Sequence, residues 1–230
     1  MKTIGLIGGM SWESSAEYYR IINEEVKNRL GGLHSAKCLL YSVDFEEMER
    51  YQAVGDWESA GKVLADIALS LEIAGANFIV ICTNTMYKVV EYLEKKVTIP
   101  IVHIADATAD QIIDAKLKKV GLLGTKYTME QDFYKDRIVA NGINVFVPTI
   151  VERNQVNDII YEELCVGVIN PSSKAYYKKV IQQLVEQGAE GIILGCTEIG
   201  LLVKPEDADV PLFDTAVIHA KAAAEHALKE

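Results

Sequence analysis

Two polar segments that directly follow apolar runs carry the side chains best suited to chemistry. Thr83-Asn84-Thr85 follows residues 78–82, and Cys196-Thr197-Glu198 follows residues 191–195. A cysteine thiolate can remove a carbon-bound proton if the thiol pKa is lowered from about 8.5, and the N-terminus of a following helix supplies positive potential for this. The alternative for Cys196 is a small buried core residue, the usual role of an isolated cysteine. Its position between an apolar run and a polar pair favours a function.

The remaining cysteines and the histidines give no comparable signal. The four cysteines are far apart, with no Cys-x-x-Cys pair and no histidine at metal-ligand spacing. We therefore expect neither a metal site nor a disulfide framework. The histidines also lack the spacing of a catalytic triad, so we interpret them as solvent-facing or hydrogen-bonded structural residues. They are His34, His103, His219 and His226.

The elements that must position these side chains are short β-rich runs alternating with segments of helical period. Before Gly31, for example, apolar side chains recur every four residues from Tyr18 to Leu30, which predicts one buried helix face. Repeated strand–helix alternation predicts α/β architecture, with parallel sheets covered by helices on both faces. The expected strands are residues 4–7, 38–43, 78–82, 101–103, 120–123, 145–147, 192–194 and 210–213.

The second half of the sequence repeats the first in three places, in the same order. Residues 2–8 resemble residues 118–124, residues 75–84 resemble 188–197, and residues 99–101 resemble 210–212. The offsets drift by only a few residues, which small deletions in loops explain. We therefore predict two homologous α/β domains, formed by residues 1–97 with 210–230 and by residues 98–209.

This duplication predicts where a ligand binds. Open parallel sheets bind ligands at the carboxyl ends of their strands. If a pseudo-twofold relates the halves, these edges face each other across a cleft. Residues 8–11 would then lie against residues 124–126, and residues 83–85 against 196–198. Two clusters that meet a small ligand from opposite faces suit removal of a proton on one side and its delivery on the other.

The composition excludes several classes of protein. The 230 residues carry a formal net charge of −10, and 50% are hydrophobic. Nucleic acids and anionic membranes need a basic binding surface, so neither is an expected partner. The longest apolar stretch is too short to span a bilayer, and the N-terminal apolar run lacks a cleavage pattern. We expect a cytoplasmic globular protein that acts on a small molecule.

Three motifs resemble one known family. Residues 194–199 (Leu-Gly-Cys-Thr-Glu-Ile) resemble the second cysteine motif of the cofactor-independent aspartate/glutamate racemases, and residues 81–86 resemble the first. Residues 4–10 resemble the opening of the aspartate racemase branch, so the resemblance covers essentially the whole chain. It implies two flavodoxin-like domains with the active site between them, and a homodimer. It also implies a two-cysteine mechanism at Cα that uses neither pyridoxal phosphate nor a metal.

Thr83 stands where this family has its first cysteine. The duplication pairs Cys196 with Thr83 and leaves Cys82 opposite Gly195, so Cys82 is expected to face the domain interior. A threonine hydroxyl is too weak an acid to be ionised at neutral pH, although it can pass on a proton through water. In the family the C-terminal cysteine acts on L-amino acids. The resemblance therefore implies preferential action on the L-enantiomer, with Cys196 as base and Thr83 on the opposite face.

Substrate binding is expected to use both segments and two further loops. Arg50 is the nearest match to the carboxylate-binding arginine of aspartate racemases, although its charged surroundings fit a solvated surface equally well, and Gln52 is a comparable candidate. The threonines and adjacent backbone N–H groups suit an α-carboxylate, although a single threonine is more often a helix cap. The expected substrate-binding residues are Met10, Ser11, Arg50, Gln52, Asn84, Thr85, Thr125, Thr197 and Glu198.

Three alternatives stay open. Cys165 stands where the family often has a lysine for the side-chain carboxylate, which favours a broad-specificity racemase acting on amino acids such as homoserine. An isomerase or decarboxylase of the same superfamily could use one cysteine to protonate one face of a planar intermediate. A non-catalytic two-domain module could bind a small ligand without chemistry, in which case Cys196 would have no need to be reactive.

Overall fold

The computed structural model describes residues 1–229 and divides into two compact units. Unit 1 is Met1–His103 together with the chain from His219 onward, and unit 2 is Ile104–Ile218. The second crossing between the units falls within the last helix, α11 (Thr215–Leu228). No helix of residues 1–229 is long and apolar enough to cross a membrane.

The observed units end a few residues later than the predicted domains. Residues 98–103 stay with unit 1, because Ile101 forms a parallel bridge to Ile79. The strand β7 (Leu212–Asp214), predicted to belong to the N-terminal domain, lies in unit 2 because it pairs with β6 (Gly191–Gly195). Both differences arise because strand pairing, which the sequence does not display, decides which unit a segment joins.

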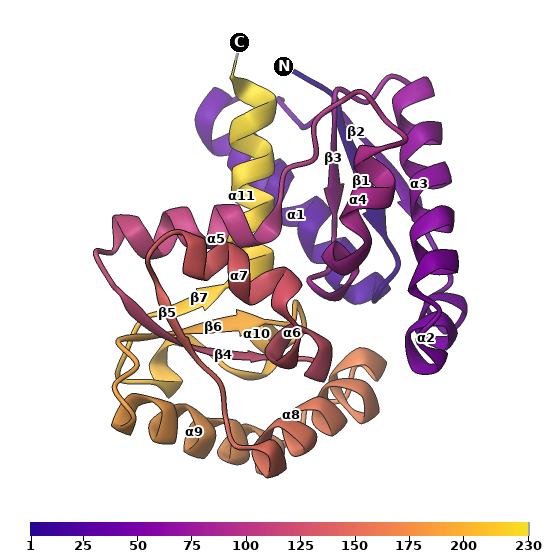
Figure 1. Ribbon diagram of the computed structural model, residues 1–230. Helices are drawn as coiled ribbons and strands as arrows, with labels where there is room; N and C mark the ends of the chain where they lie inside the picture. The colour runs from indigo at the N-terminus through magenta and orange to yellow at the C-terminus, as the bar shows by residue number, and fades with distance from the viewer. Residues whose placement is uncertain (230) are drawn as a thin grey trace. The chain divides into compact units, whose positions relative to one another are not determined.

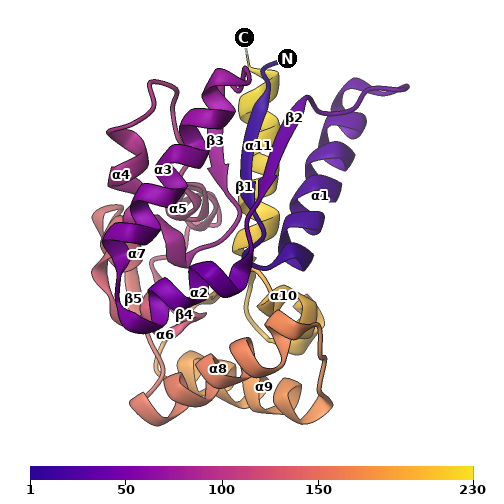
Figure 2. The same ribbon diagram turned by 90° about the vertical axis from the view of Figure 1, so that its right-hand side faces the viewer.

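Unit 1 is a parallel three-stranded sheet with helices on both faces. Its strands lie in the order β2-β1-β3, and the predicted strand 101–103 is reduced to the bridge at Ile101. Helices α3 and α4 lie on one side of the sheet, and α1 with the later part of α11 lies on the other (Figures 1 and 2). The elements are β1 (Ile4–Gly8), α1 (Trp12–Leu30), β2 (Cys38–Ser42), α2 (Phe45–Val54), α3 (Trp57–Ile73), β3 (Phe78–Ile81), the 3-10 helix η1 (Thr85–Val89) and α4 (Val90–Glu94).

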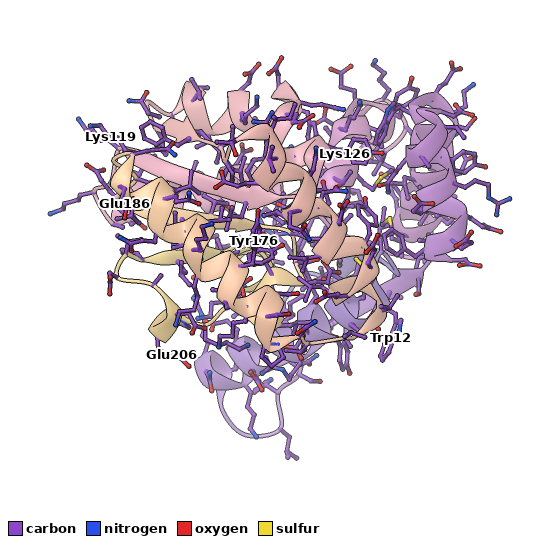
Figure 3. The ribbon with its side chains drawn as sticks, turned by 90° about the horizontal axis from the view of Figure 1, so that it is seen from below. Trp12, Lys119, Lys126, Tyr176, Glu186 and Glu206 are labelled. Carbon is purple, nitrogen blue, oxygen red and sulfur yellow. The ribbon has the colours of Figure 1, made fainter. Side chains whose placement is uncertain are left out.

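Unit 2 repeats this plan with a fourth full strand. Its parallel strands lie in the order β5-β4-β6-β7. Helices α5 and α7 lie on one side of this sheet and α8 and α9 on the other (Figure 1), and Figure 3 looks onto α9, with Tyr176 along it and Glu186 at its end. The remaining elements are α5 (Ile104–Asp114), β4 (Lys119–Gly124), α6 (Lys126–Glu130), α7 (Asp132–Ala140), β5 (Asn144–Phe146), α8 (Ile150–Glu162), η2 (Leu164–Val166), α9 (Pro171–Glu186), α10 (Ile199–Leu202) and η3 (Pro205–Asp207).

The sequence repeat is also a repeat of backbone contacts. The N–H of Ile79 donates to Pro100 O at 2.9 Å, and the matching N–H of Ile192 donates to Pro211 O at 2.9 Å. The shared strand order is that of doubly covered, flavodoxin-like sheets. The predicted α/β class with parallel sheets is thereby confirmed.

Helix α1 shows how the local sequence determines where a helix begins, where it ends and which face it buries. Ser11 caps its N-terminus by accepting the N–H of Ser14 at 3.4 Å, and Gly31, with φ of 72°, ends it. The predicted buried stripe holds as far as Val26. Leu30, however, is 45% exposed, so its prediction is wrong. It lies in the last turn, where the following Gly31 lets the chain leave the helix.

Candidate functional site

In unit 2 the two predicted segments meet at the carboxyl edge of the sheet. Strands β4 and β6 pair in register as far as Gly124 and Gly195, so Thr125 and Cys196 leave the sheet side by side. Figure 3 labels Lys119 at the amino end of β4 and Lys126 just beyond its carboxyl end, which marks this edge. The structure thus brings together two of the residues predicted for the site.

The thiol of Cys196 contacts a buried carboxylate. Cys196 Sγ donates to Glu198 Oε2 at 2.9 Å, and the Thr197 hydroxyl donates to the same oxygen at 2.9 Å. Burial raises the pKa of the Cys196 thiol well above its ordinary value, and the charge of Glu198 raises it further. In this arrangement Cys196 is a thiol whose proton points at a group able to accept it.

Two further side chains lie within electrostatic reach of Cys196: Tyr177, which the sequence pattern did not single out, and Cys165, which stands at the lysine position of the family. Burial raises the pKa of the Tyr177 phenol, and the charges of Cys196 and Cys165 raise it further. The Tyr177 hydroxyl donates to Val156 O at 3.2 Å. Charge on Cys165 likewise raises the pKa of Cys196. Cys165, predicted at the position of a lysine, therefore belongs to the surroundings of the thiol.

Thr125 has a structural task of its own. Its side-chain oxygen accepts the N–H of Thr128 at 3.4 Å and lies 3.2 Å from the Thr128 hydroxyl, which caps the N-terminus of α6. The cap and the predicted contact with a ligand are compatible, because a hydroxyl oxygen has two lone pairs and its proton can rotate.

In unit 1 the residues that follow β3 point in different directions. The N–H of Cys82 donates to Ile7 O at 2.9 Å, and the Cys82 side chain is 0% exposed, as predicted. Burial raises its thiol pKa, so Cys82 stays protonated. Thr83 is only half-buried, and its hydroxyl has no hydrogen-bond partner among residues 1–229. Of these two neighbours, Thr83 is the one open to a ligand.

Helix α2 presents Gln52 and Arg50 to different surroundings. Gln52 is buried, and its Nε2 donates to Met86 Sδ at 3.3 Å, which places it against the segment that carries Asn84 and Thr85. Arg50 is exposed, lines a cavity of about 190 Å³ with Glu47 and Tyr51, and makes no ion pair with the described part of the chain. Residues two apart on a helix do not share a face, which explains the difference.

The turn between β1 and α1 is closed tightly around Gly9. At φ of 93°, a Cβ at Gly9 would lie 2.2 Å from Val43 O, so only glycine fits. The Gly9 N–H donates to Ser15 Oγ at 2.8 Å, and that hydroxyl donates to Ser11 O at 2.9 Å. Met10 and Ser11 are buried in this turn at the carboxyl end of β1. The predicted residues of unit 1 therefore come from the turn after β1, from helix α2 and from the segment after β3.

The donor set gives no indication of a metal ion. Across residues 1–229, no three His, Cys, Asp or Glu side chains gather closely enough to hold one. The polar groups at the two sheet edges are a thiol, carboxylate, amides and hydroxyls, which suit proton transfer and recognition of a small polar molecule.

Comparison with known proteins gives one consistent set of similarities. The family model for Asp/Glu/hydantoin racemases matches residues 7–223. The broad specificity amino-acid racemase RacX of Bacillus subtilis is 22% identical over 229 residues, which is 95% of each chain.

Two solved structures match the whole chain. A Yersinia pestis protein, proposed to be an Asp/Glu racemase, is 57% identical, with a TM-score of 0.93 over 100% of both chains. An aspartate racemase homologue from Pyrococcus horikoshii OT3 is 36% identical, with a TM-score of 0.86 over 100% of both chains. The similarity therefore extends over both units.

Proposed function

Because the chain belongs to the Asp/Glu/hydantoin racemase family, whose members are isomerases, we propose that it interconverts L- and D-aspartate or glutamate without pyridoxal phosphate. The observation that carries this proposal is the contact between the Cys196 thiol and the Glu198 carboxylate at the carboxyl end of β6. A thiol beside a proton acceptor is what removal of a Cα proton requires. The choice of acidic amino acids follows the family resemblance.

The first half of the reaction uses Cys196 and Glu198. The Cys196 proton passes to Glu198 Oε2, and the resulting thiolate takes the Cα proton of the L-amino acid. The electron pair left on Cα is delocalised into the α-carboxylate, which makes the carbon planar. Glu198, predicted to bind substrate, is thereby proposed to act as the proton acceptor of the thiol, since its Oε2 already receives the Cys196 Sγ–H at 2.9 Å.

The second half of the reaction uses Thr83. Its half-buried hydroxyl, or a water bound to it, delivers a proton to the opposite face of Cα and gives the D-product. Solvent restores the Thr83 proton and takes up the proton that Glu198 accepted, so the protein returns to its starting state after one proton has left Cα and one has been added. Because the two enantiomers have equal free energy, the product ratio at equilibrium is unchanged. The handedness appears instead in a faster exchange of the Cα proton from the L-enantiomer.

Recognition of the substrate is proposed to involve side chains at both edges. Arg50 has the charge for the side-chain carboxylate, and its exposure beside a cavity leaves it able to bind one. Asn84 and Thr85 follow Thr83 directly in the chain, and Gln52 donates to Met86 just beyond them, so all three are proposed to offer polar groups to the α-carboxylate. Met10, Ser11, Thr125 and Thr197 complete the proposed set.

A broad-specificity racemase is the second candidate. Cys165, where a lysine would bind a side-chain carboxylate, lies within electrostatic reach of Cys196 and carries no positive charge. The position of Cys165 therefore gives a substrate with an acidic side chain no electrostatic attraction that a neutral substrate such as homoserine would lack. The relative RacX, described as broad in specificity, agrees with this candidate.

The decisive measurement is proton NMR of Cα–H exchange in heavy water with L- and D-aspartate, glutamate and homoserine. We expect fast exchange from an L-enantiomer and slower exchange from its D-enantiomer. Cys196→Ser should abolish exchange, and Thr83→Cys should accelerate exchange from the D-enantiomer. Cys38→Ser, which alters a half-buried thiol in β2, is the matched control and should change neither.

The outcomes separate the candidates. Faster exchange of homoserine than of both acidic substrates would support broad specificity. Equal exchange from both enantiomers in the wild type would contradict the role given to Thr83. Absence of exchange from every amino acid would contradict racemase activity, and binding without exchange would support the non-catalytic module.

A further inference from the structure

A buried histidine that is not among the proposed site residues belongs to a hydrogen-bond network that reaches the segment around Thr83. His219, on α11, is 0% exposed. Its Nδ1 lies 2.8 Å from the Tyr18 hydroxyl of α1, and its Nε2 lies 2.8 Å from Val102 O. All three residues belong to unit 1. The sequence pattern gave no reason to single out His219, because its partners are far away along the chain.

The same network includes Tyr87 of η1. The Tyr87 hydroxyl donates to Val102 O at 2.8 Å and lies 3.3 Å from His219 Nε2. It also accepts the N–H of Ile81 at 3.4 Å. Ile81 precedes Thr83 by two residues and Tyr87 follows it by four, so this hydrogen bond joins the chain before Thr83 to the chain after it.

The partners of His219 specify one tautomer. Val102 O can only accept a hydrogen bond, so Nε2 carries the proton, and Nδ1 accepts from the Tyr18 hydroxyl. Burial lowers the pKa of His219 to about 4, which agrees with a neutral ring. The Val102 carbonyl thus accepts one hydrogen bond from the Tyr87 hydroxyl and another from His219 Nε2.

His219 and Val102 also have a particular place in the chain. His219 is the first residue of unit 1 after the crossing within α11, and Val102 lies one residue before the other crossing at His103. Their hydrogen bond therefore joins the two places where the chain passes between the units. The same Val102 carbonyl accepts the Tyr87 hydroxyl, and Tyr87 in turn accepts the N–H of Ile81, which lies next to the segment that carries Thr83.

We propose that His219 is a positioning residue that, through Val102 and Tyr87, holds the Thr83 hydroxyl in place for proton delivery. This inference rests on the proposed racemase function. It concerns one half of the reaction only, because Cys196 and its partner Glu198 lie in unit 2 and make no contribution to the network. The alternative is a histidine that only stabilises the fold, which would affect both halves of the reaction equally.

The test measures two products from the same unlabelled L-substrate in heavy water. Return of the proton by Cys196 after exchange gives deuterated L-substrate, whereas delivery at Thr83 gives deuterated D-product. Their initial ratio, measured by NMR and chiral chromatography, reports the second half of the reaction alone. His219→Gln and Tyr87→Phe are each expected to lower the D-to-L ratio about tenfold, as small misplacements of a reacting group do. His226→Gln, on the same helix, is the matched control and should leave the ratio unchanged.

The results separate the two claims. An unchanged ratio in His219→Gln, with both products reduced alike, would overturn the positioning role while leaving the racemase function intact. Absence of exchange in the wild type would overturn both. If the variants do not fold, nitrogen NMR of the wild type still tests the hydrogen-bond pattern on which the proposal rests. We expect His219 as a neutral ring protonated on Nε2, and a ring protonated on Nδ1, or on both nitrogens near neutral pH, would overturn the proposal.

Discussion

At the residue scale, the arrangement around Cys196 poses a problem of proton transfer. A thiol whose pKa is raised by burial and by a neighbouring carboxylate is a poor nucleophile in the resting protein, because only the thiolate reacts. In the proposed mechanism the same carboxylate takes the thiol proton when the substrate is bound. Glu198 therefore has opposite effects on the resting thiol and on the reaction.

This opposition leads to a prediction for Glu198→Gln. Removing the negative charge lowers the pKa of Cys196, so alkylation by iodoacetamide at neutral pH should become faster. Racemisation should become slower, by about a hundredfold, because the acceptor of the thiol proton is lost. Alkylation followed by mass spectrometry and Cα exchange followed by NMR measure the two rates. Glu162→Gln, which neutralises an exposed carboxylate of α8, is the control. If both rates fell together, Glu198 would not both raise the pKa of the Cys196 thiol and accept its proton.

The positions and contacts of residues near the site could be predicted from the sequence to different degrees. The duplication alone predicted that Thr83 is the counterpart of Cys196 and that Cys82 faces the domain interior. The buried side chain of Cys82 agrees with the second prediction. The Cys196–Glu198 contact could not be predicted, because residues two apart reach each other only when the chain turns after the strand. Tyr177 and His219 gave no signal, since their partners Val156, Tyr18 and Val102 are brought to them by tertiary packing.

At the element scale, the buried network of His219 links stability to pH. The folded pKa of about 4 lies below the ordinary value of 6.5, so the unfolded chain binds a proton at higher pH than the folded chain does. The free energy of unfolding should therefore fall as the pH drops from about 6.5 to about 4, and the contribution of this group should level off below that. The Tyr18 and Tyr87 hydroxyls are the polar side-chain groups that face the ring in this network.

We accordingly predict that the wild type loses about 2 kcal/mol of unfolding free energy between pH 7 and pH 5, and that His219→Gln loses less over the same interval. Urea titrations at the two pH values measure this. The pKa of Asp207, lowered to about 2 by Lys174, does not interfere, because its stabilisation is lost only at more acidic pH. Equal losses in wild type and variant would show that other groups carry the pH dependence.

Most of the elements follow from periodicity, and their pairing does not. Seven of the eight expected strands appear with small shifts at their ends, whereas residues 101–103 form a single bridge. The two outcomes have one cause: a strand needs a neighbour, and Ile101 pairs with Ile79 alone. For the same reason β7 lies in unit 2, since Leu212 has Ile192 as its partner. The sequence repeat identifies these two pairings better than local composition does, because Ile79 and Ile192, the partners of Ile101 and Leu212, occupy matching positions in the two halves.

At the scale of the whole molecule, the net charge acts against an acidic substrate. A chain of charge −10 repels aspartate, whose own net charge is negative, whereas homoserine is neutral overall. At an ionic strength of about 0.01 M the Debye length is about 30 Å, so the charge of the whole molecule counts, and at about 0.15 M it is about 8 Å, so mainly local charges count. Arg50 is one exposed cation against this excess.

We therefore predict that kcat/KM for L-aspartate rises between these two ionic strengths, while kcat/KM for L-homoserine stays constant. Arg50→Gln should lower the aspartate value at both salt concentrations and leave the homoserine value unchanged, because it removes a local attraction for the side-chain carboxylate. Lys221→Gln changes the net charge equally at an exposed position of α11 and serves as the control. A fall in kcat/KM for aspartate with added salt would show instead that local cations, and not the net charge, govern the approach of the substrate.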